Sequence, residues 1–88
     1  MSNRWSVYIL LCGDNSLYTG ISNDVLKRLE KHRNGTGAKY TRGRGELKLV
    51  YLKEIGDKSS ALKEEYRIKQ LSKKQKLRLI ECINNLED

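Results

Sequence analysis

Two tyrosines stand ten residues apart in the stretch VYILLCGDNSLYTG, Tyr8 before a turn signal and Tyr18 after it. Both can be ordinary strand aromatics, because a phenol suits the surface of a sheet. They can also meet over a substrate and hold a water molecule. A free phenol ionises near pH 10, so a role as general base requires neighbouring cations or metal-bound water.

A carboxylate at position 65 is the second group of interest. The segment from near Ser59 or Ser60 to about Gln70 is predicted to be helical, and Glu65 falls inside its apolar stripe, whereas Glu64 falls outside. The other members of the stripe are Ala61, Leu62, Ile68 and Lys69. A carboxylate that faces the protein costs several kcal/mol unless it is paired or holds a metal ion. A Lys or Arg partner is one reading, and a magnesium ion completed by water and phosphate oxygens is the other.

Arg28 and His32 lie four residues apart in a predicted helix over residues 23–35, so they share a face. That face borders an apolar stripe of Val25, Leu26 and Leu29. A lone histidine at such an edge is more often structural than catalytic. Beside an arginine in a basic stretch, however, it is placed to touch a phosphate group.

The elements that must position these side chains follow from hydrophobic patterning and turn signals. Strands are predicted over residues 5–12, 16–22 and 46–55, and helices over 23–35, 59–70 and from a Ser72–Gln75 capping box nearly to the end. The order is β-β-α-β-α-α. It predicts a small α/β (α+β) domain whose helices pack on a short, largely antiparallel sheet.

The length of the first hairpin loop decides whether the two tyrosines meet. With a three-residue loop over residues 13–15, Tyr8 lies opposite Gly20 and Tyr18 lies opposite Leu10. The tyrosines are then diagonal neighbours on one face, roughly 7–8 Å apart. This register gathers an apolar set on the other face, which favours it: Val7, Ile9, Leu11, Leu17, Thr19 and Ile21. Gly20 is expected to leave open space beside the Tyr8 phenol.

Length and composition limit the function classes. The 88 residues predict one domain over 1–88. No apolar run approaches the roughly 20 residues of a membrane span, and the first residues lack the apolar stretch of a secretory signal. We therefore expect a cytoplasmic protein without a membrane partner. Cys12 and Cys82 are single and far apart, as expected of reduced thiols rather than a zinc or redox motif.

The net charge of +7 is concentrated in residues 27–48. This quarter of the chain has eight basic residues against Glu30 and Glu46. The basic residues are Lys27, Arg28, Lys31, Arg33, Lys39, Arg42, Arg44 and Lys48. Cations that lack balancing acids favour a polyanionic partner, most simply nucleic acid, over an acidic protein or a membrane surface.

Taken in order, these residues resemble the GIY-YIG nuclease domain, and specifically its small single-domain members. The matching segments are Ser6-Val7-Tyr8, Tyr18-Thr19-Gly20, Arg28 in KRLEKH, AKYTRGR at 38–44 and Glu65 in ALKEEYRIK. The resemblance runs from about Trp5 to Ile80. It implies a three-stranded antiparallel sheet flanked by helices. It also implies a hydrolase that uses Mg²⁺ or Mn²⁺ to cut a phosphodiester bond in DNA or RNA, with DNA favoured over RNA.

The resemblance also implies roles for single residues. Glu65 would bind the metal ion and Arg28 would stabilise charge on the scissile phosphate. Tyr8 and Tyr18 would flank the attacking water, one as general base or as its positioner, with His32 near the phosphate. The residues expected to contact nucleic acid are Gly20, Lys31, Arg33, Lys39, Tyr40, Arg42 and Arg44. The sequence departs from the two signatures at Ser6, Val7 and Thr19, which are expected to be backbone or core positions.

Two other functions remain open at this point. One is a nucleic-acid-binding module with weak or no catalytic activity, which needs the same basic loop but has no need of an inward carboxylate. The other is a protein-interaction module that uses the apolar residues of the last helix. In so small a domain these residues are expected to complete the core instead, and a monomer is favoured.

Overall fold

The computed structural model describes the backbone of residues 4–33 and 46–86, and the side chains of residues 4–31 and 46–81. Its elements are β1 (Trp5–Cys12), β2 (Leu17–Ser22), α1 (Val25–Arg33), β3 (Leu47–Gly56), α2 (Lys58–Lys69) and α3 (Lys73–Leu86). The predicted order β-β-α-β-α-α is confirmed. The strands form one antiparallel sheet in the order β2-β1-β3. Within the described ranges, no helix is long and apolar enough to cross a bilayer.

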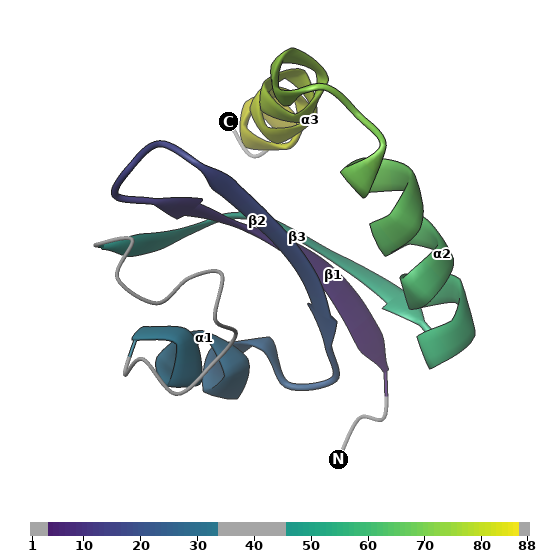
Figure 1. Cartoon of the computed structure of the whole chain (residues 1–88). Coiled ribbons are helices and arrows are strands. Elements are labelled where there is room, and N and C mark those ends of the chain that lie inside the picture. Colours follow the sequence, from purple (N-terminus) through teal and green to yellow (C-terminus); the bar gives the residue numbers. More distant parts are fainter. Residues whose placement is uncertain (1–3, 34–45, 87–88) are drawn as a thin grey trace.

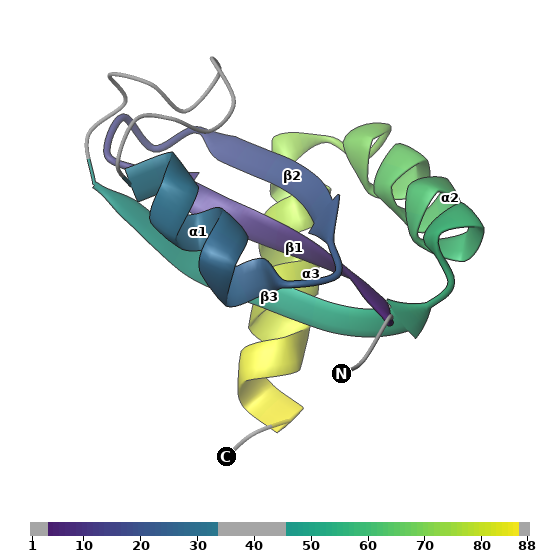
Figure 2. The same ribbon diagram turned by 90° about the horizontal axis from the view of Figure 1, so that it is seen from below.

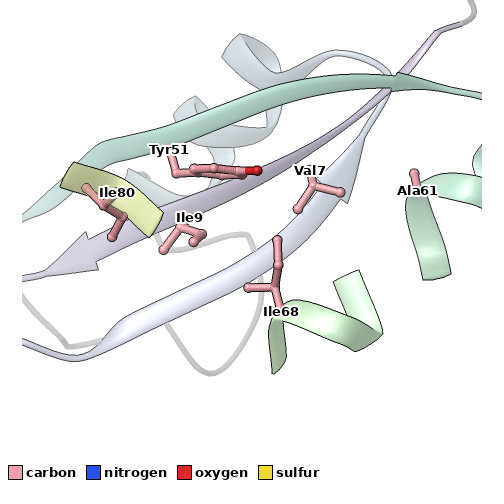
Figure 3. Packing of buried hydrophobic residues seen from close by; sticks show 6 residues of the cluster. All are labelled: Val7, Ile9, Tyr51, Ala61, Ile68 and Ile80. Atoms are coloured by element: carbon pink, nitrogen blue, oxygen red, sulfur yellow. The ribbon is translucent and has the colours of Figure 1, made fainter. Parts of the chain in front are cut away.

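The sheet separates α1 from the other two helices (Figure 1). Helix α1 lies across one face, and α2 and α3 lie on the opposite side (Figure 2). Figure 3 shows Ile68 of α2 and Ile80 of α3 pointing at Val7 and Ile9 of the central strand. These four side chains are buried together with Tyr51.

The loop between β1 and β2 has three residues, as predicted. The amide of Cys12 donates to the carbonyl of Ser16 at 2.9 Å, and the amide of Asn15 donates to the carbonyl of Cys12 at 2.9 Å. Asn15 adopts a φ of 67°, the left-handed conformation that three-residue hairpin loops require and that Asn tolerates. This loop places Tyr8 opposite Gly20 and Tyr18 opposite Leu10.

Strand β1 is buried on both faces. Val7 and Ile9 pack under α2 and α3, as the odd-numbered apolar set predicts. Tyr8, Leu10 and Cys12 form a second buried cluster on the other face with Leu29 of α1 and Leu47 of β3. The tyrosine face is therefore not an open sheet surface, because α1 covers it. The Cys12 side chain is a buried free thiol, as expected, and that of Cys82 lies outside the described residues.

A bulge in β3 explains why its apolar residues alternate only in part. Ile9 pairs with Tyr51, but the next residue, Leu10, pairs with Leu49, so Val50 is the extra residue. The odd-numbered positions change face across this bulge. Tyr51 joins the cluster under α2 and α3, whereas Leu49 joins the cluster under α1.

The two C-terminal helices begin in different ways. In α3 the predicted capping box is present: the Ser72 amide donates to Gln75 Oε1 at 2.9 Å and the Gln75 amide to Ser72 Oγ at 3.2 Å. For α2 the start was predicted near Ser59 or Ser60, and the helix begins slightly earlier, at Lys58. Asp57 caps this helix and accepts from the Ser60 amide at 3.1 Å. Gly56 before it has a φ of 130°, which a residue with a side chain rarely adopts.

Two leucines differ from the predicted apolar stripes. Leu26 of α1 and Leu62 of α2 are exposed, whereas Leu29, Ala61 and Ile68 are buried. The centre of the buried face of α2 lies between Ala61 and Ile68, which leaves Leu62 about 100° away from Ala61.

Candidate active site

The two hairpin tyrosines meet on the α1 face of the sheet. Their ring centroids are 6.3 Å apart and the ring planes are inclined at 45°. Tyr8 is buried, with 1% of its surface exposed, and Tyr18 is half-buried. The pair thus places one enclosed phenol beside one that solvent can reach.

Gly20 makes room for the Tyr8 ring. A Cβ atom at position 20 would lie 2.7 Å from Tyr8 Oη, 2.8 Å from Tyr8 Cζ and 3.2 Å from Tyr18 Cε1. The space predicted beside the phenol is therefore filled by the phenol itself. This contact gives Gly20 a positioning role, since any larger residue would displace the ring from the sheet.

Arg28 reaches the Tyr8 hydroxyl from α1. Burial is the main reason why the pKa of Tyr8 rises to about 12, and Tyr18 raises it further. A hydrogen bond from Arg28 and its positive charge lower this pKa, and the charge of Glu65 raises it. Tyr18, Arg28 and Glu65 therefore all lie close enough to Tyr8 to affect its ionisation. Because of the raised pKa, the Tyr8 phenol is neutral at physiological pH.

Two adjacent carboxylates of α2 have different surroundings. Glu64 accepts two bonds from Arg67, at 2.7 and 2.8 Å, and this pairing lowers its pKa. Glu65 has one longer contact, with Lys69 Nζ 3.5 Å from its Oε2. The two side chains are similarly buried, with 17% and 19% of their surface exposed. The prediction that Glu64 lies outside the inward face is thus wrong, because both residues flank the line from Ala61 to Ile68.

Glu65 fits a single-carboxylate metal site. Its 3.5 Å contact with Lys69 is longer than the 2.7–2.9 Å of a strong charged hydrogen bond, and Lys69 is exposed, so the carboxylate is available to a cation. Among the described residues, no three His, Cys, Asp or Glu side chains gather into a ready-made cage. A cation here would take its remaining ligands from water and from substrate oxygens, as Mg²⁺ often does.

Comparison with known proteins identifies the family of the chain. The model of the GIY-YIG catalytic domain matches residues 4–78 of the chain. The chain belongs to the GIY-YIG family. Its similar relatives include the UPF0213 protein OB0043 of Oceanobacillus iheyensis, 54% identical over 81 residues, which are 92% of this chain and 94% of that protein. The UPF0213 protein YhbQ of Escherichia coli K12 is 53% identical over 76 residues, 86% of this chain and 76% of that one.

Two solved structures share the GIY-YIG fold of this chain. The solution structure of the UPF0213 protein BH0048 from Bacillus halodurans has a TM-score of 0.59 at 46% identity, over 90% of this chain and 84% of that one. The solution structure of EF2693 from E. faecalis has a TM-score of 0.66 at 35% identity, over 96% and 92% of the two chains. The similarity therefore covers the sheet and the helices that carry the site.

Two of the three departures from the GIY-YIG signatures lie away from the tyrosine pair, whereas the third, Ser6, is half-buried two residues before Tyr8 in β1 and shares its face of the sheet. Val7 and Thr19, which replace the isoleucines of the two motifs, are buried on the face opposite Tyr8. Thr19 adds a hydroxyl there, and its Oγ1 has no hydrogen-bond partner among the described residues. These substitutions change the packing under α2 and leave the tyrosines and Gly20 in place.

The remaining predicted site residues are only partly described. Lys31 lies exposed on α1, and the backbones of His32 and Arg33 form the end of that helix, but these two side chains lie outside the described residues. Lys39, Tyr40, Arg42 and Arg44 also lie outside them. One residue near the site was missed. Tyr66 follows Glu65 directly and its ring is exposed, and an aromatic on the polar face of the helix is the signal that identifies it.

Proposed function

We propose that this protein is a nuclease that hydrolyses phosphodiester bonds in nucleic acid, with DNA favoured over RNA, and that it depends on Mg²⁺ or Mn²⁺. Membership of the GIY-YIG family supports this class of reaction. The observation that carries the proposal is the convergence of Tyr18, Arg28 and Glu65 on the Tyr8 phenol, from three different elements.

Arg28 is suited to stabilise charge on the scissile phosphate. A guanidinium has five N–H donors, so its bond to Tyr8 leaves others for phosphate oxygens. Arg28 is exposed and therefore accessible to substrate, while its contact with a buried phenol orients it. Cations held in this way act where negative charge develops in the transition state.

The two tyrosines would have different roles toward the attacking water. Tyr8 is neutral in the free protein, because its pKa is about 12, so it serves as a hydrogen-bonding positioner. Tyr18 is half-buried and faces the same space, so it is the candidate for contact with the water itself. His32, on the same helix as Arg28, would contact a neighbouring phosphate.

Glu65 would hold the divalent cation. When bound there, such an ion lowers the pKa of water and polarises phosphate oxygens. Lys69 would release the carboxylate at little cost, because the 3.5 Å contact is long and the ammonium group belongs to an exposed side chain that water can solvate. The basic side chains at positions 31, 33, 39, 42 and 44, with Tyr40, would hold the strand on either side of the cut.

The test is a cleavage assay on labelled single-stranded, duplex and branched DNA and on matching RNA, with Mg²⁺, with Mn²⁺ and with EDTA. We expect metal-dependent cutting that Glu65→Gln reduces by about 100-fold or more. Glu64→Gln is the matched control, because Glu64 is the adjacent carboxylate of equal burial whose partner is Arg67. It should cut within about two-fold of wild type. Equal activity of the two variants would contradict the metal assignment, and binding without any cutting would favour the binding-module function.

A further inference from the structure

The outer face of α2 carries two exposed apolar side chains beside the candidate site. Leu62 has 46% of its surface exposed and Tyr66 has 68%. They are one turn apart, a spacing that brings Cβ atoms to about 5–6 Å. Single exposed apolar residues are common on proteins. Two at this spacing, one of them aromatic, give the outer face of α2 a small apolar surface.

This surface is continuous with the proposed catalytic carboxylate. Leu62 lies three residues before Glu65 and four before Tyr66, so it borders both side chains. Ala61 and Ile68 point into the sheet (Figure 3), which directs Leu62 and Tyr66 towards solvent. A path along the helix surface therefore leads from Glu65 over Leu62 to the Tyr66 ring.

Cations border the Tyr66 ring on both sides. Lys63 and Lys69 lie three residues before and three residues after Tyr66, and both are exposed. An apolar protein partner would bury Lys63, and would bury Lys69 with only its 3.5 Å contact to Glu65 for compensation. A polyanion that also presents flat apolar groups matches both the ring and the charges. Nucleic acid has this chemistry, because each base is followed by a phosphate.

We infer that Leu62 and Tyr66 form a stacking platform for an unpaired nucleobase next to the scissile phosphate, with Lys63 and Lys69 contacting the phosphates that flank it. This inference rests on the proposed function and narrows its substrate class. Bases within a continuous duplex are already stacked on each other, so a side-chain platform takes a base from a single strand, a flap or a gap. The substrate is then nucleic acid with unpaired nucleotides near the cut.

The experiment measures binding by fluorescence anisotropy, in EDTA so that no strand is cut. The probes are a labelled single-stranded DNA, the same strand with abasic sites in place of its central bases, and its duplex. Loss of one stacking contact weakens binding about 5- to 150-fold, so Tyr66→Ala should bind the intact strand about 10-fold more weakly. Its binding to the abasic strand and to the duplex should not change. Tyr66→Trp should restore the affinity, because it restores a ring.

Leu62→Ala and Leu77→Ala form a matched pair of controls. Leu77 lies on α3 with 43% of its surface exposed, close to the 46% of Leu62. Only Leu62→Ala should weaken binding of the intact strand. Similar losses in both variants would overturn the platform.

Three further outcomes are decisive. The platform is wrong if Tyr66→Ala binds all three probes as wild type does, or if it loses as much affinity for the abasic strand as for the intact strand. Either result leaves the nuclease proposal to the separate Glu65→Gln cleavage assay. A wild-type protein that binds none of the probes would overturn both proposals. Sedimentation that shows a dimer dissociated by Tyr66→Ala, with DNA binding unchanged, would assign this face to a second copy of the chain and overturn the platform.

Discussion

Tyr8 combines two properties that rarely coincide in one side chain. Its ring is part of the core cluster with Leu10 and Leu29, yet its hydroxyl receives a hydrogen bond from the exposed Arg28. The surrounding core restricts the positions open to the ring, and the guanidinium is bound to a group that is itself packed on all sides. Rigid support of this kind is what a reacting geometry requires.

Removing the Tyr8 hydroxyl should lower activity more than stability. Tyr8→Phe keeps the ring but removes the acceptor for Arg28, so we expect cleavage to fall by about 10-fold or more. The free energy of unfolding should change by only about 1 kcal/mol. Tyr51→Phe is the control, because Tyr51 is also buried but lies on the opposite face of the sheet. Its cleavage rate should stay within about two-fold of wild type, and an equal fall in both variants would remove the special role of Tyr8.

The contact between Gly20 and the Tyr8 ring makes a prediction about coupling. Gly20→Ala should lower the free energy of unfolding by about 1–3 kcal/mol, because the new Cβ overlaps Tyr8 Oη and Cζ. In a Tyr8→Leu background most of this penalty should disappear, since the ring is gone. Urea denaturation of the four proteins in this double-mutant cycle measures the difference. The same penalty in both backgrounds would mean that the cost arises in the backbone of β2.

The start of helix α2 and its rotation about its own axis together position Glu65 at the candidate site. Asp57 fixes where the helix begins, and Ala61 and Ile68 fix which side faces the sheet. The carboxylate of Glu65 then lies on the side of the helix near Tyr8, and that of Glu64 lies on the side near Tyr51. Burial raises the pKa of Tyr51, and the charge of Glu64 raises it further. Sequence position alone thus separates a candidate ligand from a residue in a structural ion pair.

The capping contacts of α2 and α3 can be tested by substitution. Ser72→Ala removes the hydroxyl that accepts from the Gln75 amide, so the free energy of unfolding should fall by about 1 kcal/mol. Ser59→Ala, also near a helix start, should change it by less than about 0.5 kcal/mol, because Asp57 and not Ser59 caps α2. Urea midpoints compare the two. A larger loss for Ser59→Ala would contradict the cap at Asp57.

The parts of the fold that local sequence determines were predictable. The capping box of Ser72 and the three-residue loop with Asn15 each depend on a few neighbouring residues, and both are present. The register that brings Tyr8 and Tyr18 together follows from that loop. The start of α2 was not predictable in the same way, because Asp57, Ser59 and Ser60 are all good caps and only the left-handed Gly56 before them distinguishes one.

What the sequence did not determine depends on partners distant in the chain. The burial of Tyr8 requires α1 to cover its face of the sheet. The continuous apolar run of β1 is consistent with burial on both faces, but it does not identify the element that covers either face. The exposure of Leu62 depends on the angle at which α2 meets the sheet, and periodicity alone centred the apolar stripe too close to it. The filling of the space at Gly20 depends on the rotamer of a residue on the opposite strand.

The buried tyrosines make the free energy of unfolding of the protein depend on pH in the alkaline range. Tyr8 ionises at about 12 in the folded protein and at 10.0 in the unfolded chain, so the unfolded state releases its proton first as pH rises. Stability is therefore complete below about pH 10 and falls between about pH 10 and 12. Two pKa units correspond to about 2–3 kcal/mol at most. Tyr51 acts in the same direction, because its pKa is also raised by burial.

Comparing wild type with Tyr8→Phe isolates this contribution. The free energy of unfolding, measured in urea from pH 8 to 11, should fall less steeply with pH in the variant. Curves that run parallel across this range would show that the Tyr8 phenol ionises equally in both states.

The two adjacent glutamates of α2 also restrict how the chain can change in length. An inserted residue between Asp57 and Ala61 would turn the rest of the helix by about 100°. Glu64 would then take the position of Glu65, so the site would keep a carboxylate, but Arg67 would replace Ile68 in the core. The number of residues in this short segment is therefore constrained, because a change in length would alter the core at position 68 even where a carboxylate stays at the candidate site. In homologous chains that keep both the buried contact of Ile68 and the carboxylate at position 65, insertions and deletions are expected to fall outside residues 57–68, even where the amino acids themselves vary.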